Sequence, residues 1–335
     1  ENVTRGGGSG NQHWKERVFV GQAQKRGHSL IQDGYIPAVR QFARTGVCVA
    51  LRPRMWRIML GLKSDVTAGE SDHYAKLTSE VQRVEYATDG LLEMDVSQSS
   101  DLENYFPFED LLKSVVLAFS RDAWVRGMSM FQTHHPLIDP ADLDSTSTSP
   151  ERDKGGRSNC LKMVPPSGVL PFKGLMSYAA PLTLLFEEED AVFSVFRAMY
   201  ARYWCRLNVL RTAEGTLLPL CHLFEELLQC HDPRLFFHLT RSGIQPLAIA
   251  LPWIQFAFVG LLDPGQVLVL WDRILGFDDL ALLPVLACAI FIFRSPTVMG
   301  IADKAGIEEV FLEGTELRVA PLLQHLVFPS PCWGA

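Results

Sequence analysis

Two Cys-His pairs are the first residues in this chain whose types suggest chemistry, because thiolates and imidazoles bind zinc. The pairs are Cys221-His222 and Cys230-His231. The residues between them are predicted to form one helix, which would separate the pairs by roughly 13 Å, too far for one ion. The seven scattered cysteines are instead expected to be buried thiols in a reducing compartment, and no metal site is predicted.

Familiar catalytic and nucleotide-binding motifs are missing from the sequence. It contains no Gly-x-x-x-x-Gly-Lys phosphate loop, no His-Glu-x-x-His zinc motif and no Gly-x-Ser-x-Gly nucleophile turn. We therefore predict no cofactor of the chain's own.

The elements that must position any functional residues read as helices. Apolar residues recur at helical spacing in segments 108–120, 192–203 and 217–228. A further helix is predicted to begin at Asp263-Pro264, a capping residue followed by a first-turn proline, and to end at Gly276. Because alternating strand patterns are few and short, the fold is predicted to be all-α.

Aromatic residues at helical spacing are expected to belong to the core rather than to a ligand site. They are Phe193, Phe196, Tyr200, Tyr203 and Trp204. The segment Asp139 to Asn159 differs, because it is rich in Ser, Thr, Pro, Asp and Gly. Such a composition predicts an exposed, mobile loop (139–159), with a phosphorylation-prone regulatory loop as the alternative.

Composition limits the function classes. Hydrophobic residues make up 47% of the 335 residues, enough for a sizeable core, and the net charge of -7 argues against a nucleic-acid-binding protein. Residues 1–12 lack the apolar stretch of a secretory signal. The apolar runs 246–262 and 280–293 are shorter than the ~20 residues of a membrane-spanning helix, so both are predicted to be core helices.

Four stretches occur in an order and spacing that resemble those of one known domain. The first is Leu51-Arg52-Pro53-Arg54-Met55-Trp56, preceded by Gly46. The last covers Ile244 to Leu247, Pro252-Trp253-Ile254 and Trp271-Asp272. With the two stretches described next, they resemble the TBC domain of Rab GTPase-activating proteins over roughly residues 35 to 330. The resemblance implies a two-lobed helical fold with Trp56 packed in its core.

The second stretch corresponds to the family motif Ile-x-x-Asp-x-x-Arg, whose arginine is the catalytic arginine finger. The nearest match runs from Leu92 to Gln98, with Asp95 in place and Gln98 at the finger position. A second frame, from Tyr86 to Leu92, also lacks an arginine. By resemblance, Asp95 would form an ion pair with Arg52; an aspartate here is also suited to capping a backbone N–H.

The third stretch corresponds to Tyr-x-Gln-Gly-Met, which carries the catalytic glutamine of the family. This chain reads Pro171-Phe172-Lys173-Gly174-Leu175, followed by Ala179-Ala180. Gly174 and the two alanines fit the motif, whereas Pro171 replaces Tyr and Lys173 replaces Gln. We call residues 170–182 the finger segment, and Gln98 and Lys173 the finger positions.

The resemblance implies a Rab-family small GTPase as partner, which would bring its own nucleotide and Mg²⁺. With both catalytic groups replaced, GTPase-activating activity of the usual type is predicted to be weak or absent. Lys173 would then contact an acidic or phosphate group of the partner, or both finger positions would be ordinary solvated residues. The first hypothesis is a non-catalytic Rab effector or adaptor in membrane traffic, cytoplasmic or peripheral to membranes through its partners.

Two other hypotheses remain open at this point. The chain could be an active GTPase activator that uses other groups, such as Arg152 or Arg157 of the 139–159 loop, or a structural scaffold. The expected organisation is a polar, partly flexible segment 1–30, an N-terminal lobe 31–190 that carries the finger positions, and a C-terminal lobe 191–335.

Overall fold

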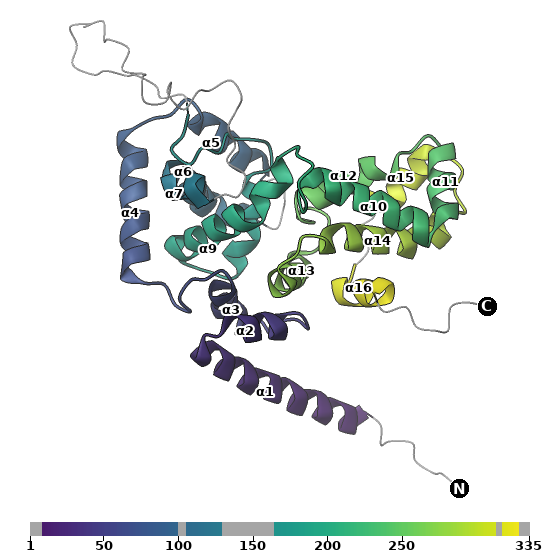
Figure 1. The fold of residues 1–335 in the computed structure, drawn as a ribbon, viewed down its shortest axis with the longest axis horizontal. Coiled ribbons are helices and arrows are strands. Elements are labelled where there is room, and N and C mark those ends of the chain that lie inside the picture. Colours follow the sequence, from purple (N-terminus) through teal and green to yellow (C-terminus); the bar gives the residue numbers. More distant parts are fainter. Residues whose placement is uncertain (1–8, 100–104, 129–163, 313–316, 328–335) are drawn as a thin grey trace, which may run out of the picture. The chain divides into compact units, whose positions relative to one another are not determined.

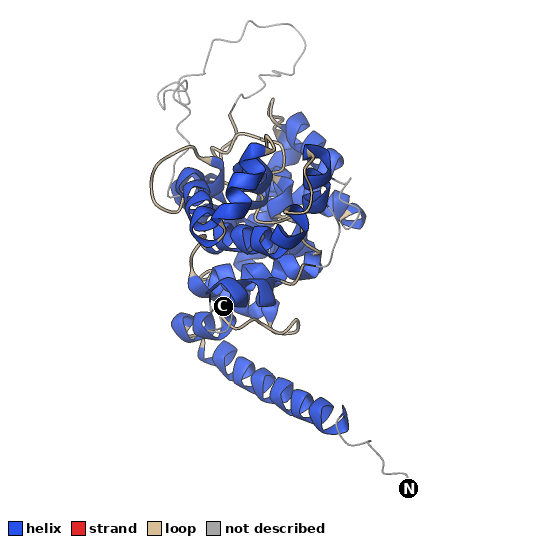
Figure 2. Ribbon diagram, turned by 90° about the vertical axis from the view of Figure 1, so that its right-hand side faces the viewer, coloured by secondary structure: helices blue, strands red, loops and turns tan. Residues whose placement is uncertain are grey.

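The computed structural model describes residues 9–99, 105–128, 164–312 and 317–327. Across these residues the ordered elements are helices joined by loops (Figure 2). The single β-bridge among them is isolated and joins Val259 to Leu262. The predicted all-α fold is therefore confirmed. The predicted loop 139–159, with Arg152 and Arg157, lies outside the described residues, as do Cys160 and Cys332.

The chain divides into two compact units, the first consisting of Glu1–Asp65 with Trp271–Asp278 and the second of Val66–Leu270 with Asp279–Ala335. These bounds differ from the lobes expected from the sequence, which stay a prediction. Helices of the first unit are α1 (Ser9–Asp33), α2 (Ile36–Ala43) and α3 (Arg52–Met59). Helix α13 (Pro264–Phe277) contributes its residues from Trp271 onward to this unit.

Helix α13 begins at Pro264 as predicted, but Gly276 does not end it. A Cβ atom at Gly276 would lie 2.8 Å from the backbone nitrogen of Arg44 and 3.0 Å from the carbonyl oxygen of Arg40. The glycine therefore lets the end of α13 approach the end of α2, where the Arg44 Nε donates to the Gly276 carbonyl at 3.1 Å. Gly276, which was expected to end the helix, is instead the residue at which α13 packs closely against the end of α2.

The second unit contains the remaining helices, which can be followed in Figure 1. Its α-helices are α4 (Ala68–Arg83), α5 (Asp89–Ser99), α6 (Glu109–Arg121), α7 (Ala123–Met128), α9 (Glu189–Arg202), α10 (Leu217–His231), α11 (Pro233–Arg241), α12 (Pro246–Gln255), α14 (Leu282–Val298), α15 (Lys304–Leu312) and α16 (Val319–Val327). Its 3-10 turns are η1 (Phe106–Phe108), η2 (Met176–Tyr178), η3 (Ala180–Leu184) and η4 (Trp204–Asn208).

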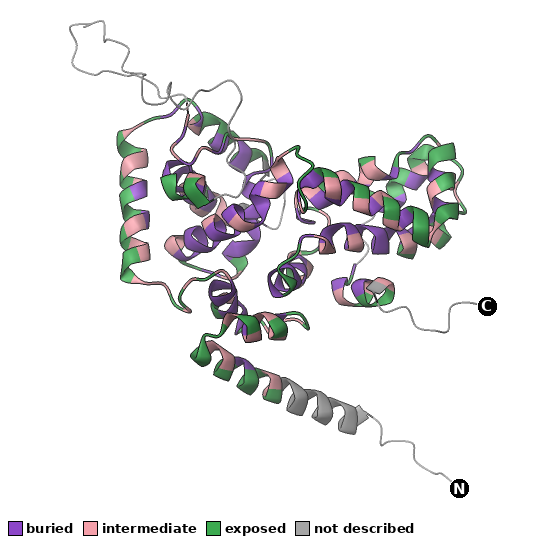
Figure 3. Cartoon of the chain, in the orientation of Figure 1, coloured by how far each residue is buried: buried purple, intermediate pink, exposed green. Residues whose placement is uncertain are grey.

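Helices α4, α5, α6, α7 and α9 pack together around aromatic side chains. The predicted core aromatics of α9 and η4 are all buried, and Phe119 of α6 lies 4.7 Å from the Phe196 ring and 5.0 Å from the Tyr200 ring. Figure 3 shows the outcome: α6 and α9 are mostly buried, whereas α4 is exposed along much of its length. Ion pairs also connect these helices; for example, Arg121 of α6 pairs with Asp89 of α5 at 2.6 Å.

Helices α10, α12 and α14 form a second packed group, with α11, α15 and α16 beside them. The ring of Phe291 lies 4.4 Å from Phe311 and 5.7 Å from Trp253, which places Trp253 in an apolar aromatic cluster. The apolar run 280–293 lies mostly in α14, whereas the run 246–262 is helical only as far as Gln255, where α12 ends. No described helix is long and apolar enough to cross a membrane.

Candidate functional site

The finger segment is an irregular turn structure built on one glycine. It runs through η2 and η3, and Gly174 before them has φ +92°, a left-handed conformation that L-residues rarely adopt. From Gly174 to Leu182 the segment is buried, whereas Lys173 immediately before it is exposed. The exposed Lys173 side chain therefore extends from a turn, and the residues that follow it are buried in the core.

Asp95 anchors this turn to helix α5. Its two carboxylate oxygens accept hydrogen bonds from the backbone N–H groups of Gly174 at 2.5 Å and Met176 at 2.9 Å. Asp95 is only 6% exposed, so these charge-assisted bonds lie in a poorly solvated place where they are strong. The carboxylate thus fixes the backbone next to Lys173.

Helix α12 supports the same turn from another direction. A Cβ atom on Gly174 would lie 2.5 Å from the Phe256 ring, so only glycine fits against this aromatic side chain. The Tyr178 hydroxyl donates to the Gln255 carbonyl and accepts from the Asn208 side-chain amide at 3.1 Å. Burial raises the pKa of Tyr178 well above its ordinary value, so this hydroxyl stays neutral and remains a donor. Two supports, Asp95 and the end of α12, therefore hold the turn.

The structure brings the two finger positions together. Gln98 and Lys173 line one pocket of about 150 Å³, with Asp95 and Phe172 also in its wall. Gln98 is exposed on α5, and Lys173 makes no hydrogen bond or ion pair with any described residue. Lys173 is the single cationic side chain among the described residues that line this pocket. We call this depression the finger pocket.

Arg52, Trp56 and Asp272, three of the motif residues, form a buried cluster in the first unit. The Arg52 guanidinium donates to the Asp272 carboxylate at 3.0 Å, and the Trp56 indole N–H donates to it at 2.7 Å. The Val47 backbone N–H adds a further bond at 3.2 Å. Burial raises the pKa of Asp272, while Arg52, Trp56 and Val47 oppose that rise by stabilising the carboxylate.

Arg52 and Asp95 each have partners within their own unit. The Arg52 guanidinium pairs with the fully buried Asp272, a carboxylate that needs a cationic partner. Asp95 binds backbone N–H groups, which is the capping role predicted for it beside the ion pair. Because Asp95 and Arg52 belong to different units, the ion pair between them stays a prediction.

Both Cys-His pairs lie on helix α10, as predicted from the sequence. No group of three or more potential ligands occurs among the residues that the structure describes. Cys221 is buried, which raises the pKa of its thiol to about 11, and the exposed His222 pairs with Glu226 at 3.2 Å. Cys230 is exposed and Cys48 is only partly buried, so both depart from the expectation of buried thiols.

Two supporting residues of the site were not predicted from the sequence. Phe256 and Gln255 lie far along the chain from Gly174 and Tyr178, so no local pattern connects them. Only the structure marks this place, because Ala257 and Phe258 after them have φ of 48° and 67° although neither is a glycine. Such strain persists only where the surrounding structure imposes it.

Comparison with known proteins agrees with this fold and these motifs. Residues 172–299 match the family model described as the Rab-GTPase-TBC domain. Human TBC1 domain family member 19 is 36% identical over 314 residues, which cover 93% of this chain and 57% of that protein. A TBC domain-containing protein kinase-like protein of Dictyostelium discoideum is 30% identical over 105 residues, which cover 31% of this chain and 10% of that protein.

Solved structures share the fold at low sequence identity. The RabGAP TBC domain of a Chlamydomonas flagellar protein superposes with a TM-score of 0.61 at 13% identity, covering 97% of this chain and 95% of that chain. The Ypt/Rab-GAP domain of Gyp1p gives 0.56 at 14% identity, covering 87% of this chain and 91% of that chain. This chain spans 57% of the length of its human relative. Residues 172–299 thus match the Rab-GTPase-TBC domain, and the fold of the chain is that of solved TBC domains.

Proposed function

We propose that this domain binds a Rab-family GTPase and does not accelerate GTP hydrolysis in the usual way, so that it acts as an effector or adaptor in membrane traffic. One observation carries the proposal: Gln98 and Lys173 line the same pocket, beside the carboxylate that anchors the finger segment. This proximity of two residues far apart in sequence supports their proposed correspondence to a catalytic arginine and glutamine, which would have to act on one nucleotide.

The chemistry of the two side chains argues against ordinary activation. GTP hydrolysis develops negative charge on the phosphates, and an arginine finger that neutralises it contributes ~10³–10⁵ in rate, or roughly 4–7 kcal/mol. The amide of Gln98 carries no charge. The ammonium of Lys173 has only donors, so it lacks the acceptor with which a glutamine orients the attacking water.

Lys173 suits a binding role better than a catalytic one. It is exposed, Asp95 fixes the backbone that follows it through Gly174 and Met176, and no described residue neutralises it. An ammonium held in this way can pair with an acidic side chain or a phosphate of a bound GTPase without prior rearrangement of the turn.

A Rab panel tests the proposal. Each GTPase, loaded with a non-hydrolysable GTP analogue or with GDP, is measured for binding to the purified chain, and each GTP-loaded form for single-turnover hydrolysis. We expect GTP-dependent binding to at least one member without acceleration of hydrolysis. Clear acceleration by the wild-type chain would contradict the effector role, and absence of binding to every member would indicate a scaffold.

Restoring the catalytic side chains provides the matched control. The variant Gln98→Arg/Lys173→Gln should bind the same Rab and accelerate its hydrolysis by about 10³-fold or more over the wild-type chain. The single variant Lys173→Gln should not, because it still lacks the guanidinium. If the double variant binds but stays inactive, the proposed correspondence of the finger positions loses its support.

A further inference from the structure

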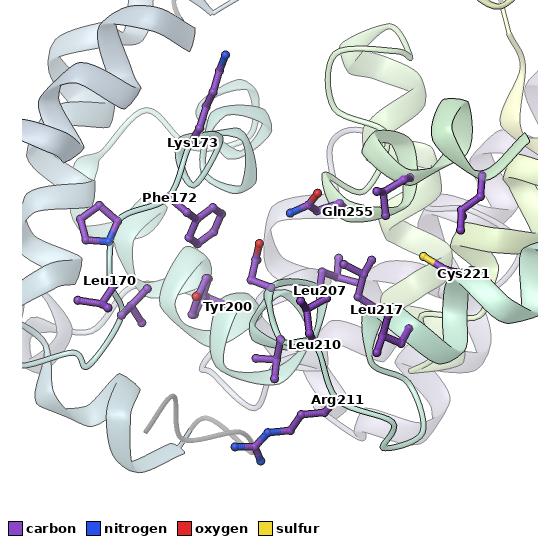
Figure 4. A pocket seen from close by; sticks show the side chains of 17 residues that line it. Leu170, Phe172, Lys173, Tyr200, Leu207, Leu210, Arg211, Leu217, Cys221 and Gln255 are labelled. Atoms are coloured by element: carbon purple, nitrogen blue, oxygen red, sulfur yellow. The ribbon is translucent and has the colours of Figure 1, made fainter. Parts of the chain in front are cut away.

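A second depression adjoins the finger segment. It is an open groove of about 1080 Å³ in the second unit, and residues 169–173 form one wall (Figure 4). The other walls come from the chain after η4 and from helices α10 and α12, which contribute Leu217, Leu247 and Gln255. We call it the apolar groove, because leucine, valine, proline and phenylalanine make up most of its lining.

The apolar groove and the finger pocket share a boundary. Pro171, Phe172 and Lys173 line both depressions, so the finger segment is the ridge between them. In Figure 4 the Phe172 ring turns toward the groove, while the Lys173 side chain extends away from it. A partner that reaches Lys173 therefore lies next to the groove.

Large exposed leucines surround the groove. Leu210 is 77% exposed, Leu218 is 44% exposed and Leu170 is 37% exposed. Single exposed apolar residues are common on proteins, but several of them around one concave apolar site are typical of an interface. Covering them would bury the kind of side chain that stabilises protein complexes.

The charges of the groove differ from those of the whole chain. The chain has 38 acidic and 31 basic residues, yet the described residues that line the groove include Lys173 and Arg211 and no acidic side chain. In Figure 4 these two cations leave the groove at opposite ends of the view. An apolar site bordered by cations is complementary to an apolar segment bordered by acidic groups.

We infer that the apolar groove holds an apolar loop or helix of the bound GTPase, flanked by at least one acidic side chain, and that Leu210 and Leu218 determine which GTPase fits. The inference rests on the proposed function and adds the chemistry of the partner's surface. A protein segment suits the groove better than a bilayer, because a membrane surface is too broad to enter a concave site and would touch only its rim.

The test uses the Rab that binds best in the panel. Leu210→Glu/Leu218→Glu introduces two charges at exposed positions, so the fold should tolerate both; a thermal-unfolding measurement checks this. We expect Kd for the GTP-loaded Rab to rise about tenfold or more, since a charge would have to be buried against an apolar segment. The control Leu312→Glu alters a leucine that is 81% exposed on α15 and should change Kd less than about twofold.

Each outcome separates the inference from the proposed function. If the folded double variant binds the Rab as tightly as the wild-type chain, the groove inference is overturned while Rab binding stands. If no Rab binds the wild-type chain, both are overturned. The double variant and the wild-type chain are also compared for binding to phosphatidylserine vesicles and for self-association in sedimentation. If the variant keeps Rab binding but loses vesicle binding, the groove is assigned to a lipid; if it loses self-association instead, the groove is assigned to a second copy. Either result overturns the inference.

Discussion

Asp272 shows how one buried side chain can organise its surroundings. Its carboxylate accepts from the Arg52 guanidinium, the Trp56 indole and the Val47 backbone, and none of its surface is exposed. A buried carboxylate is costly unless it is paired and hydrogen-bonded. All three donors meet that requirement here, which explains why the two sequence motifs that contain Arg52 and Asp272 belong together.

Removing this carboxylate should be strongly destabilising. Asp272→Ala leaves the Arg52 charge buried without its partner, and we expect a loss of about 3–5 kcal/mol in the free energy of unfolding. Asp278→Ala is the control, because it breaks an ion pair with Arg40 in which Asp278 is 31% exposed, and should cost at most about 1 kcal/mol. Urea denaturation measures both. Similar losses for the two variants would refute the importance assigned to the Asp272 cluster.

Prediction from the sequence succeeded for residues whose roles depend on local context. The α9 aromatics were correctly assigned to the core, because helical spacing indicates which side chains face inward, and Trp56 was assigned there through the family resemblance of its motif. The pairing of Arg52 with Asp272 was not predicted, since the two residues are distant in sequence and meet only through tertiary packing. The roles of Gln98 and Lys173 stay predictions.

At the level of elements, the finger segment depends on a contact between a turn and a helix end. Gly174 needs both its left-handed φ of +92° and the space that the Phe256 ring leaves. The sequence motif identifies Gly174, but no pattern in the sequence connects this glycine with Phe256. The helix start at Pro264 was predictable, because capping chemistry is local, whereas the role of Gly276 was not, because the helix that it approaches is distant in sequence.

Two glycine substitutions separate backbone strain from steric exclusion. Gly243 has φ +75°, and a Cβ atom added there would meet nothing within 4 Å, so Gly243→Ala should cost only the strain, about 1–2 kcal/mol. Gly174→Ala adds a clash with Phe256 and should cost about 1–3 kcal/mol more. In a Phe256→Ala background this excess should shrink, as chemical denaturation can measure. Equal losses at the two glycines would argue against a steric role for Phe256.

For the whole molecule, charge is the property that distinguishes the proposed interface. A net charge of -7 repels an acidic partner at long range, while Lys173 attracts it locally. The screening length falls from about 30 Å at 0.01 M salt to about 10 Å at 0.1 M, so salt weakens both contributions. A single cation at the contact should therefore affect association most at low salt.

Lys173→Gln should lower the association rate constant for the Rab selected by the panel, and the difference from the wild-type chain should narrow as salt rises from about 0.01 to 0.1 M. Lys304→Gln is the control: it removes the same charge from α15, where Lys304 pairs with Glu308 at 3.6 Å. Stopped-flow association measures both. The control tests the effect of net charge alone, so a rate loss confined to Lys173→Gln would indicate a local contact. Equal losses would mean that Lys173 acts only through the total charge, and its proposed contact with the GTPase would be wrong.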